Sequence, residues 1–375
     1  MRVAFIGTRG VPATFGGIEH HVEEVGGRLA ARGHDVTVYC RANYVDDSQR
    51  GYKGMRLARL PTVSSKRLDA IVHSALSTAR ALGQGYDVVH FHALGPGVMT
   101  PVAQYASRAR VVQTIHGLDD ERAKWGSGAR VLLRGGGWLS ARVPDATVVV
   151  SRTLADHYMQ KYGRRTTYIP NGVAAPARSP APQEIATRFG LHGGDYVLFV
   201  GRLVPEKAPD LLLRAFRRVP GDVRLVIAGG SSFTDRYTDS LVDMAAEDKR
   251  VVLPGYVYGD TLAELYANAR AFVLPSVVEG LPLTLLEAAS YGTPVVASAI
   301  GPHTEIVGSD RPGHRLVPPG DDGALAAALL QTLAGGPEVE AGAEQLRERV
   351  LTEYSWDRAV DATEALYRRL TGPSA

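Results

Sequence analysis

The sequence predicts an α/β protein made of two doubly wound, Rossmann-like domains. Its 375 residues exceed the usual size of one domain, about 100 to 200 residues, so two domains are the leading prediction. Short, β-branched apolar runs alternate with segments of helical periodicity, which is typical of parallel strands joined by crossover helices. This alternation stops at a Pro-rich stretch near the middle of the chain and then begins again.

Residues 1–173 are predicted to form the first of these domains. Between its first two apolar runs, Val22, Val25 and Leu29 recur at helical spacing and Gly33 follows as a cap. The domain therefore opens with a strand, a helix and a second strand. The expected strands are Val3–Ile6, Val36–Tyr39, Val88–Phe91, Val111–Ile115 and Thr147–Val150.

The stretch AAPARSPAP, residues 174–182, is rich in Pro and small residues and predicts an extended connector. We assign residues 174–194 to the linker and 195–355 to the second domain. Residues 356–375 should form a C-terminal helix that could pack back on the first domain. The strands expected in the second domain are Tyr196–Val200, Arg224–Ala228, Val251–Leu253, Ala271–Leu274 and Val295–Ala297.

The composition excludes several classes of protein. Hydrophobic residues make up 45% and charged residues 22% of the chain, as in globular proteins and unlike disordered or coiled-coil chains. The net charge of +3 is too small to indicate a nucleic-acid partner. The lone Cys40 cannot form an internal disulfide, and no apolar run approaches the roughly 20 residues that span a bilayer. We therefore expect a cytoplasmic protein whose apolar start is a strand and not a secretory signal.

Loops that directly follow the strands are where ligands are expected, because ligands of open α/β sheets bind beyond the carboxyl ends of the strands. The first such loop, Gly7–Gly17, opens a helix. Its paired Gly16 and Gly17 let the backbone approach a ligand closely, and the free N–H groups of the helix suit a phosphate. A plain turn is the alternative, because the loop lacks both the dinucleotide-binding glycine spacing and the Lys of a P-loop.

The second loop, Gly201–Lys207, carries two cations directly after a strand of the second half. Arg202 offers a forked donor and Lys207 a point charge, and together they could neutralise a diphosphate. The alternative is a pair of solvated surface charges.

The third loop leads into the most specific segment, EGLPLTLLEA, residues 279–288. Pro282 suits the first position of a helix, whose first free amides would point at a ligand above the sheet. These amides belong to Leu281, Leu283 and Thr284. Glu279 would lie in the approach loop and Glu287 just over one turn inside the helix, where two carboxylates suit the hydroxyls of a sugar and a ribose. The alternative is a capping acid and a solvated helix acid.

The spacing of Glu279 and Glu287 in EGLPLTLLEAASYGTPVVAS, together with GRLVPEKAPDLLLRAF and IPNGV, resembles glycosyltransferase family 4. The segments GTRGVPATFGGIEHHVEEV and TIHGLDDERAKWG are similar to a bacterial, rhamnosyltransferase-like branch that builds surface polysaccharides. The resemblance covers nearly the whole chain. It implies the GT-B fold, in which two Rossmann-like domains face each other across an interdomain cleft. It also implies a retaining, metal-independent transfer of a hexosyl unit from a nucleoside diphosphate sugar.

The resemblance implies a role for each residue at a matching position. Gly16 and Gly17 would face the donor diphosphate, and Arg202 and Lys207 would bind it. The ribose would be held by Glu287, and the hydroxyls of the donor sugar would be contacted by Glu279. The remaining donor-binding positions are Gly280, Leu281, Leu283 and Thr284, with Tyr256 and Val257 of LPGYVYGD in the loop that touches the base.

His116, which ends a strand in TIHG, would lie at the reacting centre according to the same resemblance. The catalytic residues would then be His116, Glu279, Arg202 and Lys207. A lone His after a strand is otherwise more often a packed or hydrogen-bonded residue.

The chain departs from many relatives at Pro282, where they carry Gly or Ser, and Pro removes one N–H from the phosphate-binding helix. No Asp-x-Asp occurs in the sequence, so we expect neither a metal nor another cofactor. The acceptor would be a saccharide, a lipid-linked saccharide or a small molecule. Alternatives are a nucleotide-sugar epimerase or phosphorylase of the same shape, or a non-catalytic sugar-nucleotide-binding subunit.

The segment from Arg122 to Arg134 mixes cations with Trp125, and Trp138 follows. It could dock peripherally on anionic lipid headgroups near a lipid-linked acceptor. A solvated helix face explains the pattern equally well. The sequence indicates no particular oligomeric state.

Overall fold

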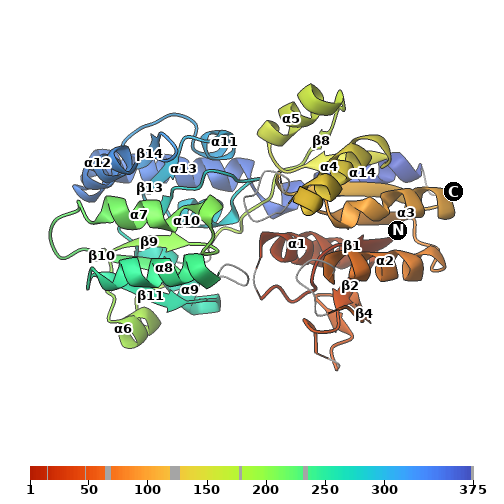
Figure 1. Cartoon of the computed structure of the whole chain (residues 1–375), viewed down its shortest axis with the longest axis horizontal. Coiled ribbons are helices and arrows are strands. Elements are labelled where there is room, and N and C mark those ends of the chain that lie inside the picture. Colours follow the sequence, from red (N-terminus) through yellow and green to blue (C-terminus); the bar gives the residue numbers. More distant parts are fainter. Residues whose placement is uncertain are drawn as a thin grey trace. The chain divides into compact units, whose positions relative to one another are not determined.

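The computed structural model describes the chain except for Phe15, Asp47 and residues 64–68, 119–126, 177–179, 231–234 and 373–375. For residues 127–133 and 235 it describes the backbone alone. The chain divides into two compact units (Figure 1). Unit 1 contains Met1–Gly172 and Trp356–Ala375, and unit 2 contains Val173–Ser355. Each unit is an α/β layer structure around its own sheet, as the sequence predicts.

Unit 1 is built on a sheet with the strand order β3-β4-β2-β1-β5-β6-β7-β8. Neighbouring strands are parallel except for β3 and β4, which form an antiparallel pair. The strands are β1 (Arg2–Ile6), β2 (Asp35–Arg41), β3 (Gly51–Tyr52), β4 (Met55–Leu60), β5 (Val88–His92), β6 (Arg110–Ile115), β7 (Ala146–Val149) and β8 (Thr167–Tyr168). The helices are α1 (Gly17–Ala31), α2 (Asp69–Leu82), η1 (Pro96–Met99), α3 (Thr100–Ala106), α4 (Ser127–Arg142), α5 (Arg152–Tyr162) and α14 (Trp356–Thr371).

The two faces of the unit 1 sheet have different cores, which is clearest along β5. On one face, Val89 and Phe91 pack with Ala81 of α2 and Ala103 of α3 in an apolar cluster. Because successive side chains of a strand point to opposite faces, His90 and His92 lie on the other face, towards α1 and α14. That face therefore has a buried polar layer.

Helix α14 completes unit 1 from the far end of the sequence (Figure 1). It packs against α1, where Arg32 lies 2.7 Å from Asp361 and 2.9 Å from Glu364. Its buried Tyr367 hydroxyl contacts Nδ1 of His90. The predicted C-terminal helix thus belongs to the first domain.

Unit 2 is built on a parallel sheet with the strand order β11-β10-β9-β12-β13-β14. Its strands are β9 (Tyr196–Val200), β10 (Arg224–Ala228), β11 (Val251–Gly255), β12 (Ala271–Leu274), β13 (Val295–Ser298) and β14 (His314–Val317). Its helices are α6 (Glu184–Phe189), η3 (Pro205–Lys207), α7 (Pro209–Phe216), α8 (Asp235–Ala246), α9 (Gly259–Asn268), α10 (Leu283–Ser290), α11 (Gly301–Val307), α12 (Asp322–Leu333) and α13 (Pro337–Glu353). No helix in the described part of either unit has the length and apolar character to cross a bilayer.

The structure differs from the sequence prediction mainly in four additional strands and in the linker. The ten predicted strands are present, with ends shifted by two residues at most. The sequence missed β3, β4, β8 and β14. The predicted linker, 174–194, is too long, because α6 forms within it and packs against α9 of unit 2.

Candidate functional site

The order of strands reverses once in each sheet, between β1 and β5 in unit 1 and between β9 and β12 in unit 2. Ligands of doubly wound sheets bind beyond the carboxyl ends of the strands at such a switch point. The loop Gly7–Gly17 follows β1, Gly201–Lys207 follows β9, and Glu279 lies beyond β12. The loops singled out in the sequence therefore adjoin the switch points.

Lys207 and Glu279 join the two loops of the unit 2 switch point. The Lys207 ammonium donates to Oε1 of Glu279, and their side chains are only 13% and 9% exposed. Burial alone would raise the pKa of Glu279, but the charge of Lys207 and a hydrogen bond from it lower that pKa below its usual value. Glu279 is thus a nearly buried, ionised carboxylate. The alternative, in which Lys207 is a solvated surface charge, is therefore wrong.

Arg202 lies on the same loop and remains more accessible, with 39% of its side chain exposed. Its guanidinium is 3.8 Å from Oε1 of Glu206, whose side chain is only 5% exposed. Neither carboxylate oxygen of Glu206 has a hydrogen-bond partner among the described residues. Glu206 was not predicted from the sequence, although an acid between two cations in the loop could have indicated it.

Helix α10 begins one residue later than predicted. Pro282 has φ −76° and ψ 111° and is the N-cap, so Leu283 is the first helical residue. The Pro282 carbonyl accepts from the amides of Leu285 and Leu286, which leaves the amides of Leu283 and Thr284 without an acceptor within the helix. The prediction that Pro282 occupies the first helical position is therefore wrong, because its φ fits the N-cap equally well.

Thr284 adds a polar side chain at this helix start. Its Oγ1 is buried and has no hydrogen-bond partner among the described residues. A buried hydroxyl without a partner is costly, so this atom suits a ligand oxygen. Gly280 and Leu281 precede the helix and are buried.

Glu287 lies farther along α10 and is half-buried. Its Oε2 accepts a hydrogen bond of 2.8 Å from the hydroxyl of Tyr266 on α9. Tyr266 in turn stacks on Tyr291. The carboxylate is therefore held in place by a buried tyrosine, which contradicts the alternative of a solvated helix acid.

Tyr256 and Val257 lie in the loop after β11. Backbone hydrogen bonds join residues at the ends of β9, β10 and β11. The amide of Gly229 donates to the Gly255 carbonyl over 2.8 Å, and Leu203 donates to the Gly230 carbonyl over 3.0 Å. A Cβ at Gly229 would collide with the Gly201 carbonyl, and one at Gly230 would collide with the Tyr256 ring. The Tyr256 ring is 40% exposed and stacks on Tyr258, while Val257 is buried.

His303 is a further site residue that sequence reasoning missed. It follows β13 at the start of α11, is fully buried, and its Nδ1 lies 2.8 Å from the Ser298 carbonyl oxygen. Burial lowers the pKa of His303 to about 4, and the nearby Glu279 charge offsets this only in part. The imidazole beside Glu279 is therefore neutral.

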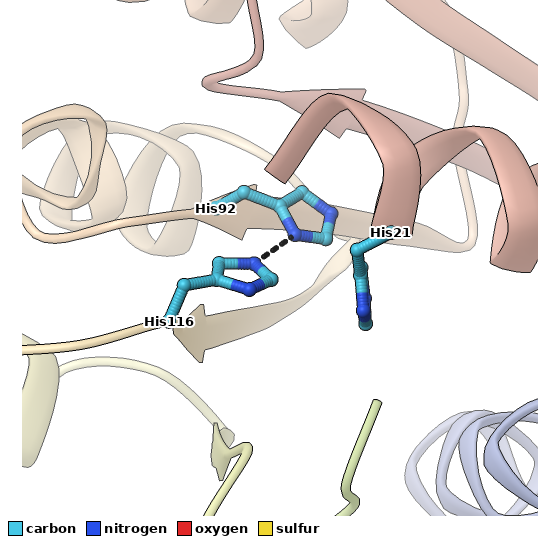
Figure 2. A group of neighbouring side chains, drawn as sticks. All are labelled: His21, His92 and His116. Atoms are coloured by element: carbon cyan, nitrogen blue, oxygen red, sulfur yellow. Dashed lines mark hydrogen bonds between the residues drawn. The ribbon is translucent and has the colours of Figure 1, made fainter. Parts of the chain in front are cut away.

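His116 directly follows β6 in unit 1 and belongs to a cluster with His92 and His21 (Figure 2). Nδ1 of His92, at the end of β5, lies 3.1 Å from Nε2 of His116. The His21 ring projects from α1 towards this pair, with centroids 4.8 Å from His116 and 5.4 Å from His92. Of these three residues only His116 was predicted from the sequence, although His92 also ends a strand and His21 lies in the helix that follows Gly16 and Gly17.

The cluster is desolvated and uncharged at neutral pH. Burial lowers the pKa of His21 to about 4, although Nδ1 of His21 pairs with Oδ1 of Asn171 at 2.9 Å. Burial also lowers the pKa of His92 and His116 well below the usual value. These rings therefore act as neutral hydrogen-bonding groups or ligands.

Gly16 and Gly17 lie at the exposed start of α1. Gly16 is the N-cap with φ 104°, a conformation that favours glycine. A Cβ at Gly16 would lie 2.2 Å from Oε2 of Glu19. Glu19 accepts from the Arg9 amide over 3.1 Å, which folds the loop over the start of the helix.

The predicted site residues thus form two local groups. The group in unit 2 contains Arg202, Lys207, Tyr256, Glu279 and Glu287. The group in unit 1 contains Gly16, Gly17 and His116. The segment Arg122–Trp125 lies outside the described residues. On α4, Arg134 is exposed and Trp138 is 55% exposed.

We expect acid to destabilise unit 1 through the histidine cluster. His21 has a pKa of about 4 in the folded protein and of about 6.5 in the unfolded chain. Its contribution to the stability is therefore fully present above pH 6.5 and is lost as the pH falls towards 4. At pH 5 its loss amounts to about 2 kcal/mol. Urea unfolding followed by tryptophan fluorescence measures this, because all tryptophans fall within the ranges of unit 1.

The control compares two variants across pH 7.5 and 5. His21→Gln should reduce the loss of stability between pH 7.5 and pH 5 by about 2 kcal/mol. His192→Gln, which replaces an exposed residue, should leave that loss unchanged. An equal pH dependence in both variants would contradict the assignment.

Comparison with known proteins places both halves among glycosyltransferases. A family model described as Glycosyltransferase Family 4 matches residues 15–175, and one described as Glycosyl transferases group 1 matches residues 194–335. The chain is 32% identical over 395 residues to a D-inositol 3-phosphate glycosyltransferase of Geodermatophilus obscurus, covering 94% of this chain and 84% of that protein. It is 28% identical to a GDP-mannose-dependent phosphatidylinositol monomannoside mannosyltransferase of Mycolicibacterium smegmatis, covering 93% and 94%.

Solved structures share the fold over the whole chain. The sucrose-phosphate synthase of Thermosynechococcus elongatus has a TM-score of 0.85 at 25% identity, with 100% of both chains covered. Anabaena HepE, solved with UDP and glucose, has a TM-score of 0.84 at 18% identity, covering 99% of this chain and 100% of that chain. The latter likeness concerns the fold alone.

Proposed function

Because the chain belongs to glycosyltransferase family 4, we propose that it transfers a hexosyl unit with retention from a nucleoside diphosphate sugar. The acceptor would be a saccharide, a lipid-linked saccharide or a small molecule, in polysaccharide or glycoconjugate biosynthesis. The observation that carries this proposal is the buried Lys207–Glu279 pair at the unit 2 switch point. In this proposal Lys207 would serve the donor phosphates and Glu279 the hydroxyls of the sugar.

The donor phosphates are assigned to the cations and amides of unit 2. Arg202 keeps an accessible guanidinium, and Lys207 has two further donor protons when one is given to Glu279. The amides of Leu283 and Thr284 at the N-terminus of α10 add the positive end of a helix dipole. These groups would stabilise the charge that grows on the departing diphosphate.

The two acids are assigned to the two ends of the donor. Glu279 precedes α10 and would accept from hydroxyls of the sugar, while Glu287 within α10 would accept from the ribose. The exposed Tyr256 ring supplies a face for the base, with Val257 beside it. His303 is near enough to Glu279 to interact with its charge and would help to keep that carboxylate in position.

His116 is assigned to the reacting centre, and Gly16 and Gly17 to the diphosphate. Since Nε2 of His116 is engaged by His92, Nδ1 is the nitrogen left for a substrate. In a same-face retaining transfer, the departing phosphate oxygen accepts the proton of the acceptor hydroxyl as the new glycosidic bond forms. No side-chain nucleophile is needed in that step.

We expect transfer to survive a strong chelator, because Arg202, Lys207 and the α10 amides meet the phosphate charge that a metal would otherwise neutralise. The measurement compares initial rates in EDTA with rates in added Mg²⁺ or Mn²⁺. Loss of transfer in EDTA that Mg²⁺ or Mn²⁺ restores would count against a metal-independent site.

The proposal is tested first with donors. A panel of nucleotide sugars is screened for a rise in melting temperature, since a ligand that binds the folded state stabilises it. The best donor is then incubated with and without candidate acceptors. Transfer that requires an acceptor supports the proposal, consumption of donor alone would indicate an epimerase, and binding without turnover would indicate a non-catalytic subunit.

Peripheral contact with a membrane is part of the proposal for a lipid-linked acceptor. The exposed Arg134 and Trp138 on α4 support it, because cations and an aromatic ring suit an anionic headgroup region. Sedimentation with anionic vesicles, compared with neutral ones, tests this contact. Equal sedimentation of a Trp138→Ala, Arg134→Ala variant would contradict it.

A further inference from the structure

We propose that His21, His92 and His116 form a binding site for one divalent transition-metal ion of the zinc class. Each residue offers one ring nitrogen, and these nitrogens all lie within 4.8 Å of one another. The three side chains come from α1, the end of β5 and the residue after β6 (Figure 2). The strand order places the ends of β5 and β6 side by side, so the cluster is built by the sheet itself.

The distances are close to those of a chelating site. A tetrahedral zinc ion with Zn–N bonds of about 2.0 to 2.1 Å separates its ligand nitrogens by about 3.3 Å. Nδ1 of His92 and Nε2 of His116 are already 3.1 Å apart. Since the three nitrogens lie within 4.8 Å of one another, closing the group around an ion requires relative movements of about 1.5 Å at most, within reach of side-chain rotations.

The surroundings of the cluster resemble those of a ligand set. The Nδ1–H of His21 can donate to Oδ1 of Asn171 at 2.9 Å, and an oxygen acceptor of this kind orients a ligating imidazole and leaves its other nitrogen free to bind. Nε2 of His92 is buried and has no hydrogen-bond partner among the described residues. The His92 ring, which contacts His116 through Nδ1, therefore has one nitrogen to which the described protein groups offer no partner.

The neighbouring His90 is excluded from the site. Its Nδ1 pairs with the Tyr367 hydroxyl and its Nε2 lies 2.7 Å from Oγ1 of Thr114. The group identified within the described residues thus offers three imidazoles and no carboxylate. Such ligands favour zinc, nickel or copper over magnesium or calcium, and three of them leave a fourth position for water or a small anion.

Occupancy of this site should inhibit transfer. An ion held by His116 would add two positive charges beside the proposed reacting centre. This consequence rests on the proposed function, whereas metal binding does not. Micromolar Zn²⁺ should therefore lower the transfer rate at least 10-fold, and EDTA should restore it.

The binding test uses Co²⁺ as the probe, because tetrahedral Co²⁺ has intense visible absorption. The full-length protein should bind one Co²⁺, which Zn²⁺ displaces and Mg²⁺ does not. His92→Asn and His21→Gln should each weaken this binding at least 100-fold. The matched control is His20→Gln, the adjacent residue on α1, which lies outside the group and should leave the affinity unchanged.

A second measurement needs no variant that could misfold. X-ray absorption of the zinc-loaded wild-type protein should report three imidazole ligands. Fewer than three imidazoles, or the absence of one saturable Co²⁺ site in the wild-type protein, would overturn the metal site whether or not transfer is observed. Full transfer by zinc-saturated protein would overturn the inhibitory consequence. Failure of every donor and acceptor, with metal binding intact, would count against the proposed function alone.

Discussion

Replacing Lys207 with Met should lower transfer at least 100-fold and destabilise the protein by about 3 to 5 kcal/mol. The catalytic loss is expected because a charge beside the departing diphosphate is removed. The loss of stability follows because Glu279, whose side chain is 9% exposed, would keep a buried charge without its partner. Steady-state kinetics and urea unfolding measure the two effects separately.

The double variant Lys207→Met, Glu279→Gln separates stability from catalysis. It should regain most of the lost stability, because no unpaired charge remains, and should stay inactive. Recovery of transfer, or an equal loss of stability in the single and double variants, would contradict the coupling. Arg202→Ala tests the second cation and should weaken donor binding. Because it also removes the charge 3.8 Å from Glu206, whose side chain is 5% exposed, some loss of stability is expected in this variant as well.

The pH dependence of Lys207→Met gives a further check on the same pair. In the wild-type protein the pKa of Glu279 is lowered, so its contribution is present above the unfolded pKa of about 4.3 and is lost as the pH falls through the folded pKa. Without Lys207, burial should raise the pKa of Glu279 instead. The stability deficit of the variant should therefore shrink as the pH falls from 7 towards 5.

Glu287→Gln should weaken binding of the free nucleoside diphosphate about 10- to 100-fold, whereas Glu279→Gln should leave that binding almost unchanged and impair transfer. A hydrogen bond to a charged group contributes about 1.5 to 3 kcal/mol, and glutamine keeps the size of the side chain while removing the charge. The contrast follows from position, because Glu279 precedes α10 and Glu287 lies within it. Calorimetric titration beside a transfer assay measures both arms.

Tyr266→Phe is the control for Glu287, because it removes the 2.8 Å hydrogen bond to Oε2 and leaves the carboxylate in place. It should weaken nucleotide binding less than Glu287→Gln does. Equal losses of nucleotide affinity in Glu279→Gln and Glu287→Gln would contradict the assignment of the two acids. Normal transfer by Glu279→Gln would contradict it as well.

The central strands could be predicted from the sequence because parallel strands are buried on both faces and form continuous apolar runs. Strands such as Tyr196–Val200 and Ala271–Leu274 have the predicted ends. The missed strand β4 has the sequence MRLARL, in which arginines interrupt the apolar residues. The missed β8 has only two residues, too few to carry a pattern.

Each loop of the candidate site could be predicted from the sequence, but the contacts between the loops could not. The Gly-rich, cationic and acidic loops each carry a local signal, but Lys207 and Glu279 are 72 residues apart and meet because β9 and β12 are neighbours. The same holds for His92 and His116, which depend on the pairing of β5 with β6. Strand order is a property of the folded chain, so these pairs required the structure.

The division of unit 1 between the two ends of the chain sets an order for folding during synthesis. Domains generally fold as they leave the ribosome, beginning at the N-terminus. Here the sequence of unit 2 is complete at Ser355, while unit 1 still lacks Trp356–Ala375. Until α14 emerges, the polar layer around His90 lacks the cover of Tyr367. A stop codon at position 356 would therefore release a complete second domain attached to a first domain that lacks α14.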